Sequence, residues 1–169
     1  MALSKSLKSL TLITTTSAAT LLLIQACGGG AWAEAAADAD PLEGVWESVI
    51  TVKDCTSGAV LASFRGLAVH HRGGTVSADN SRPPATRGAA FGTWKRTAGG
   101  AGNAYTATFI FMRFNPDSSL AGTQKVARSF TLGSDGNSLA GTNTIQMIDS
   151  AGAVLQQGCA TETGVRTAG

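Results

Sequence analysis

Strand-forming residues recur between residues 44 and 167 in short runs, which clusters of Gly, Asn, Asp, Ser and Pro interrupt. Runs of β-branched and aromatic residues bounded by turn residues are typical of β-strands. No stretch repeats its apolar residues at the 3.6-residue spacing of a helix. The pattern predicts eight strands, over residues 44–53, 59–71, 75–78, 89–97, 104–114, 120–132, 138–148 and 153–167.

Eight short strands joined by tight turns predict an all-β meander of antiparallel neighbours. Such a sheet keeps two unpaired edges unless its first and last strands also pair. If they do, an antiparallel register that places Trp46 opposite Arg166 brings Cys55 within two positions of the residue opposite Cys159. A shift of two positions keeps side chains on the same face of the sheet, so one register suits both pairs. We therefore predict a closed, eight-stranded, antiparallel up-and-down barrel, with a β-sandwich as the alternative.

The start of the first predicted strand, Gly44-Val45-Trp46, resembles the Gly-x-Trp motif of lipocalins and other calycins. In that family an arginine near the end of the last strand packs across the tryptophan and closes the barrel, a role that the resemblance implies for Arg166. A guanidinium over an indole is a favourable cation–π pair. The Thr-Asp-Tyr loop motif and the C-terminal helix of lipocalins are missing, so the likeness is to compact, avidin-like calycins. Residues 44–163 are also similar to a group of exported bacterial proteins of unassigned activity.

The first 33 residues have the three parts of an export signal. Lys5 and Lys8 lie in a segment without acidic residues, an apolar and hydroxylated run covers residues 10–26, and Ala31-Trp32-Ala33 offers the small residues that a signal peptidase reads. The run is too rich in threonine for a membrane span, which needs about 20 mostly apolar residues. We predict a cleavable signal peptide over residues 1–33, a flexible linker over 34–43 and a barrel domain over 44–169.

A second processing route is also compatible with this segment. Ile24-Gln25-Ala26-Cys27 resembles a bacterial lipobox, in which Cys27 carries a lipid. The protein is then either secreted or periplasmic, or anchored to the cell envelope through Cys27. On both routes Cys55 and Cys159 remain as a pair in an oxidising compartment, where a disulfide between them is expected.

Net charge argues against two classes of partner. Residues 1–33 contain two of the 13 basic residues and none of the 11 acidic ones, so the remainder has 11 of each sign and no net charge. Binding to nucleic acid or to an anionic membrane needs a basic face. We expect no nucleic-acid partner, and a membrane partner only if Cys27 is lipidated; the sequence leaves the oligomeric state open.

Side-chain alternation along the strands predicts which residues point into the barrel. Gln124 and Arg128 share one face of the strand over residues 120–132, and Asn143 and Glu162 fall on the same face of the two strands that follow. Arg128 and Glu162 are expected to pair there. Polar groups mixed with apolar ones are typical of a pocket for a small amphiphilic molecule, whereas many small barrels are simply filled by their own side chains.

No established catalytic or metal motif occurs in the chain. It has no Gly-x-Ser-x-Gly, His-Glu-x-x-His or phosphate-loop sequence. His70 and His71 are adjacent, so on a strand they point to opposite faces and cannot bind one metal together; we interpret one as a polar residue at a strand end and the other as exposed. We expect no metal or cofactor.

The expected function is non-catalytic binding of a small amphiphilic or apolar ligand. The alternative is a ligand-free structural or interaction module of the cell envelope, and an enzyme is the least favoured interpretation.

Overall fold

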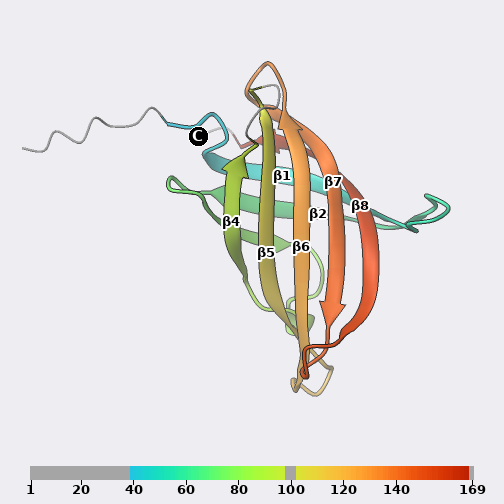
Figure 1. Cartoon of the computed structure of the whole chain (residues 1–169). Helices are drawn as coiled ribbons and strands as arrows, with labels where there is room; N and C mark the ends of the chain where they lie inside the picture. The colour runs from blue at the N-terminus through green and yellow to red at the C-terminus, as the bar shows by residue number, and fades with distance from the viewer. Residues whose placement is uncertain (1–38, 98–101, 168–169) are drawn as a thin grey trace, which may run out of the picture. The chain divides into compact units, whose positions relative to one another are not determined.

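The computed structural model describes residues 39–97 and 102–167, which form a closed antiparallel barrel (Figure 1). Every strand pairs with the next along the chain, and the last pairs with the first. This confirms the predicted all-β, eight-stranded up-and-down barrel and rules out the sandwich. The strands are β1 (Gly44–Lys53), β2 (Val60–His70), β3 (Thr75–Asn80), β4 (Ala90–Arg96), β5 (Ala104–Phe114), β6 (Leu120–Leu132), β7 (Ser138–Ile148) and β8 (Val154–Arg166), with a 3₁₀ turn, η1 (Pro84–Thr86).

The strand bounds follow the sequence pattern closely. β1, β5, β6 and β7 have the predicted bounds, β2, β4 and β8 are one residue shorter at each end, and β3 continues two residues further, to Asn80. Asp79 and Asn80 favour turns, yet they pair with Leu67 and Gly66 of β2. The predicted signal peptide and Cys27 lie outside the described residues. Within those residues, no helix is long and apolar enough to cross a membrane.

Pairing between β1 and β8 closes the barrel in the predicted register, from Trp46 opposite Arg166 to Lys53 opposite Cys159. The guanidinium carbon of Arg166 lies 4.5 Å from the centroid of the buried Trp46 ring. Arg166 also donates hydrogen bonds to the backbone oxygens of Glu43 (2.6 Å) and Gly136 (3.1 Å). One side chain therefore ties together the start, the end and the β6–β7 turn of the barrel.

Residues 39–43 belong to the barrel, which corrects the predicted linker. Leu42 is fully buried in the core, and its carbonyl accepts a hydrogen bond from the indole nitrogen of Trp46 at 2.9 Å. Asp40 accepts one from the Tyr105 hydroxyl at 2.8 Å. A single leucine among small and acidic residues has no periodicity, so no local pattern marks it as buried. Residues 34–38 lie outside the described part of the chain.

Inward-facing aromatic and aliphatic side chains plug the end of the barrel that contains Trp46, which we call the closed end. The Tyr105 and Phe130 rings stack with centroids 5.8 Å apart, and the Trp94 ring lies 6.1 Å from Tyr105. Leu132 and Leu139 complete the same cluster. The β1–β2, β3–β4, β5–β6 and β7–β8 turns lie at the opposite end, which we call the open end.

Several turns are stabilised in the same way, by the side chain of an aspartate. Four aspartates each stand at or near the start of a turn, and each accepts at least one hydrogen bond from a backbone N–H that follows it: Asp54, Asp117, Asp135 and Asp149. Bonds from Ser57 hold the pKa of Asp54 below its usual value. Such side-chain turns favour tight connections between strands. This shared chemistry accounts for the similar sequences around residues 57–61 and 151–155, where Gly58 and Gly152 both have positive φ.

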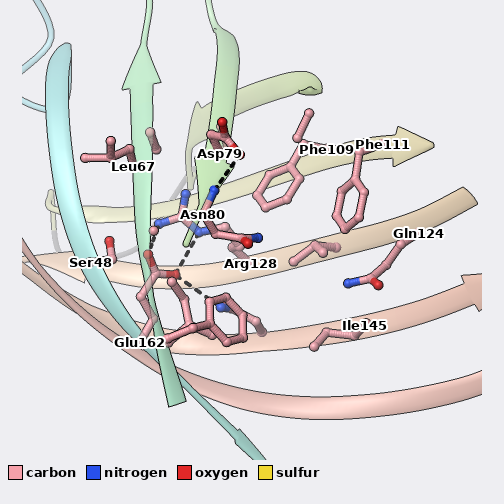
Figure 2. A pocket seen from close by; sticks show the side chains of 18 of the residues that line it. Ser48, Leu67, Asp79, Asn80, Phe109, Phe111, Gln124, Arg128, Ile145 and Glu162 are labelled. Carbon is pink, nitrogen blue, oxygen red and sulfur yellow. Dashed lines mark hydrogen bonds and ion pairs between the residues drawn. The ribbon is translucent and has the colours of Figure 1, made fainter. Parts of the chain in front are cut away.

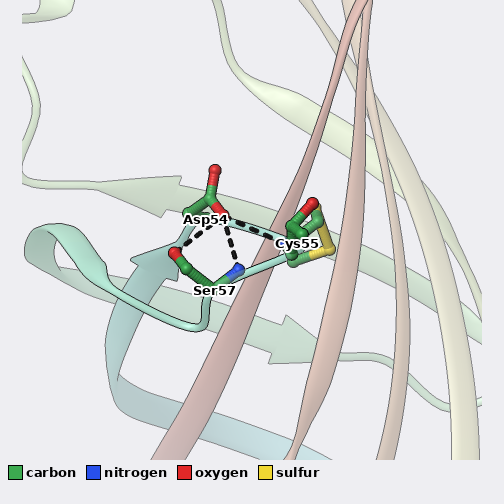
Figure 3. The surroundings of a disulfide bond; sticks show 5 residues. Asp54, Cys55 and Ser57 are labelled. Atoms are coloured by element: carbon green, nitrogen blue, oxygen red, sulfur yellow. Dashed lines mark hydrogen bonds between the residues drawn. A yellow bond between two sulfur atoms is a disulfide. The ribbon is translucent and has the colours of Figure 1, made fainter.

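The predicted disulfide between Cys55 and Cys159 is present, with the two Cα atoms 5.3 Å apart (Figure 3). Cys159 lies on β8, opposite Lys53, and Cys55 follows in the β1–β2 turn. The bond therefore fastens this turn to the strand that closes the barrel. The two cysteines are 104 positions apart in sequence, so in the chain-entropy account the bond strongly restricts the unfolded chain.

Replacing both cysteines by alanine should lower the free energy of unfolding by about 4 kcal/mol, because the unfolded chain regains the freedom that the long closed loop removes. Urea unfolding followed by tryptophan fluorescence measures the change. Dithiothreitol should destabilise the wild type similarly and leave the double variant unaffected. A loss below about 1 kcal/mol would show that the bond adds little to the β1–β8 pairing.

His70 differs from its sequence interpretation, because it is a core residue of the closed end. Its side chain is 1% exposed, and its ring lies 6.0 Å from those of Trp94 and Phe130. Neither ring nitrogen has a hydrogen-bond partner among the described residues. Burial lowers the pKa of His70 to about 3, and the charge of Arg128 acts in the same direction. His71 is exposed, as expected, and contacts the Ser77 hydroxyl at 3.1 Å.

This burial predicts a loss of stability in mild acid. The unfolded chain binds a proton at His70 near pH 6.5, whereas the folded protein keeps the ring neutral down to about pH 3, so acid favours unfolding. Between about pH 7.5 and about pH 5, the free energy of unfolding should fall by about 2 kcal/mol. Urea unfolding across this range tests it: His70→Phe should remove most of the dependence and His71→Gln should keep it, whereas equal behaviour of the two variants would contradict the assignment.

Candidate functional site

Between the closed-end core and the open end, the barrel contains two adjoining cavities. The inner cavity has a volume of about 70 Å³, and the outer cavity, at the open end, has about 330 Å³. They share six lining residues, which places them next to each other along the barrel axis: Phe64, Asn80, Arg87, Phe111, Gln124 and Ile145. We call the two together the lumen.

A buried ion pair lines the deep part of the inner cavity (Figure 2). Arg128 of β6 donates from Nε to Glu162 Oε2 at 3.0 Å and from Nη2 to Oε1 at 2.7 Å, and both side chains are almost fully buried. Asn143 of β7 donates to the same Oε2 at 3.1 Å. Strand alternation in β6, β7 and β8 brings the three together, because all point inward. The expected pairing of Arg128 with Glu162 is therefore present.

This ion pair separates the lumen from the closed-end core. The guanidinium carbon of Arg128 lies 4.7 Å from the centroid of the Phe130 ring, which belongs to that core. Both carboxylate oxygens of Glu162 accept hydrogen bonds from Arg128, so the two charges compensate each other. The result is a polar but charge-balanced surface at the inner end of the lumen, which we call its floor.

Apolar side chains make most of the lumen wall above this floor. Ala90, Phe111 and Val126 form a small buried cluster, with Phe109 and Ile145 packed against it. Gln124, two positions from Val126 on the same face of β6, lines both cavities. The lumen thus has apolar sides with amide and charged groups at a few defined points, as small-molecule sites usually do.

The four residues predicted to face the lumen, Gln124, Arg128, Asn143 and Glu162, all line the inner cavity. Their role in binding a ligand stays a prediction. The sequence reasoning missed Asp79, Asn80 and Arg87, which lie at the end of β3 and in the irregular segment before β4. The predicted strand ended at residue 78, so alternation was not applied to Asp79 and Asn80, and it cannot place Arg87, which lies outside a regular strand.

Arg87 reaches the lumen from this segment and is 7% exposed. It forms an ion pair with Asp79, and its guanidinium carbon lies 5.0 Å from the centroid of the Phe111 ring. Burial lowers the pKa of Arg87. A buried cation is thereby held between an aromatic wall and a carboxylate at the open end.

No cluster of three or more His, Cys, Asp or Glu side chains that could hold a metal ion is found within residues 39–97 and 102–167. His70, which is buried in the closed-end core, does not line either cavity.

Comparison of the chain with protein-family models and with curated proteins finds no match. The likeness to calycins therefore rests on the closed eight-stranded meander and on the contact between Trp46 and Arg166.

The buried ion pair gives a prediction about stability. Glu162→Ala should lower the free energy of unfolding by about 3–5 kcal/mol, because it leaves the Arg128 charge buried without a partner. Replacing both residues by methionine should restore most of this loss, since apolar side chains can fill the space without a charge. Urea unfolding of the single and double variants measures both effects.

The matched control is Glu47→Ala, which breaks the solvent-exposed pair with Arg65 on the outside of the barrel. Its cost should stay below about 1 kcal/mol. If the Arg128→Met/Glu162→Met double variant were as unstable as Glu162→Ala, the effect would come from lost packing and not from the unpaired charge.

Proposed function

We propose that this protein is an exported barrel that binds a small amphiphilic or apolar molecule in its lumen and does not change it chemically. The observation that carries the proposal is a lumen plugged at one end, with apolar walls above a polar, charge-balanced floor. The outer cavity, about 330 Å³, falls in the range of about 300–1,000 Å³ that small-molecule pockets occupy.

The chemistry of the inner cavity supports binding more than catalysis. Its charged lining residues stand in two ion pairs, Arg128 with Glu162 and Arg87 with Asp79. A general acid or base needs a proton that it can exchange with a substrate. Groups held in this way are better suited to orienting a polar part of a ligand.

The disulfide supports export, because such bonds persist in oxidising compartments. We propose secretion or a periplasmic location after removal of the signal peptide, with a lipid anchor at Cys27 as the alternative route.

Uptake of N-phenyl-1-naphthylamine, an uncharged probe that fluoresces in apolar surroundings, tests the proposed function. We expect saturable binding to the wild type. Gln124→Trp should weaken it by about tenfold or more, because a bulky side chain at the junction of the two cavities fills the space that the probe needs. Fluorescence titration measures the affinity.

The control is Lys125→Trp, in which the same side chain is added one position along β6 on the exposed outer face. It should bind the probe like the wild type. Equal loss in both variants, or no saturable uptake by the wild type, would contradict binding in the lumen and favour a packed structural or interaction module.

A further inference from the structure

The charged residues that line the outer cavity are all arginines. They are Arg82, Arg87 and Arg113, and no carboxylate of the described residues lines this cavity with them. The chain outside the predicted signal is neutral as a whole, so this is a local separation of charge. A cationic hollow with partly apolar walls favours an anionic group over a neutral or cationic one.

Arg87 and Arg113 lie side by side. Their backbones form an antiparallel bridge between the segment before β4 and the end of β5. Residues directly opposite each other in such a bridge project to the same face, and both of these residues line the outer cavity. Two like charges at adjacent positions repel each other unless a counter-charge lies between or above them.

The carboxylates near this pair leave it incompletely compensated. Arg87 has Asp79 as its ion-pair partner, but the Asp79 side chain is 70% exposed and its charge is therefore screened by water. Arg87 Nε and Arg113 Nη1 are both buried and have no hydrogen-bond partner among the described residues. Buried donors of this kind normally have a partner.

Other acidic residues at the open end are held in the turns. Asp54, Asp117 and Asp149 accept hydrogen bonds from their own turns, and none of them lines the outer cavity. They are therefore poorly placed to neutralise Arg87 and Arg113.

The positions of the arginines and of the apolar side chains along the barrel axis favour one orientation of a ligand. Arg82 lies over the Phe64 ring at 5.6 Å and Arg87 over the Phe111 ring at 5.0 Å, measured from guanidinium carbon to ring centroid. The apolar wall continues from Phe111 to Phe109 and Val126 in the inner cavity. Cationic groups thus stand at the open end and apolar groups lie further inside.

We propose that the lumen selects a small apolar molecule with a single anionic group, a carboxylate, sulfonate or phosphate. Arg87 and Arg113 bind the anion at the open end, with Arg82 at the rim, and the apolar part lies against Phe111 and points inward. A guanidinium offers paired donors that match the oxygens of such groups. This inference rests on the proposed function and adds the charge and the orientation of the ligand.

Two probes with one aromatic framework test this charge selection. 1-Anilinonaphthalene-8-sulfonate is N-phenyl-1-naphthylamine with an added sulfonate, so their affinity ratio isolates the anionic group. The wild type should bind the sulfonate about tenfold more tightly than the uncharged probe, as expected for a hydrogen-bonded charge pair. Arg113→Gln should remove most of this preference, because it should weaken binding of the sulfonate probe about tenfold more than binding of the uncharged probe.

A second arginine variant and a control variant complete the test of charge selection. Arg82→Gln, at an exposed position, should reduce the preference for the sulfonate even if Arg113→Gln fails to fold. The control is Arg72→Gln, which removes an exposed arginine from the β2–β3 turn at the closed end and should leave both affinities unchanged. Sulfonate fluorescence that persists in Gln124→Trp would place that probe outside the lumen and overturn the proposal.

Competition for the bound sulfonate probe identifies the class of anion. Nonanoate and octyl phosphate carry the same octyl chain with different anionic groups, and octyltrimethylammonium carries it with a positive charge. Displacement by either anion at concentrations about tenfold below those needed for the cation supports the proposal and shows which anion fits better.

Equal displacement by all three compounds would overturn the charge selection, as would equal weakening of both probes in arginine variants that unfold at the same urea concentration as the wild type. In both outcomes the wild type still binds the uncharged probe in the lumen, so the proposed function stands. A wild type that binds neither probe overturns both.

Discussion

Antiparallel pairing of β1 with β8 is the constraint on which the whole structure depends. Without it, the meander has two free edges and no interior. With it, Trp46 is sealed beneath the Arg166 guanidinium, the residues that precede β1 pack as a base, and the interior becomes a plugged, one-ended space. The disulfide secures the same junction near the open end, so covalent and non-covalent contacts hold one pair of strands from both ends.

The interior is divided into layers because inward-facing side chains change in kind along the barrel axis. A dense cluster of aromatic and aliphatic residues fills the closed end, a charge-balanced ion pair spans the middle, and a smaller apolar cluster around Phe111 lines the space towards the open end. The ion pair has two consequences: it ends the packed core and it lines the lumen with a polar surface. A buried pair is weak evidence for stability by itself, which fits a role in shaping the site.

Much of the fold could be predicted because its signals are local. Strand composition and the turn residues set the eight strands, and alternation placed Gln124, Arg128, Asn143 and Glu162 on the lumen side. The same reasoning failed for Leu42 and His70. Leu42 precedes the first strand and has no periodic neighbours, and the burial of His70 depends on Trp94 and Phe130 from other strands.

The sequence by itself determined the order of the strands, their closing register and the pair of cysteines, since these follow from alternation, turn chemistry and the spacing of a few marked residues. Only the tertiary structure decided that Arg87, from an irregular segment, stands beside Arg113 at the open end. It also decided that the closed end is packed while the open end is hollow. Both features depend on contacts between side chains from strands that are far apart in the sequence, and local sequence patterns do not specify such contacts.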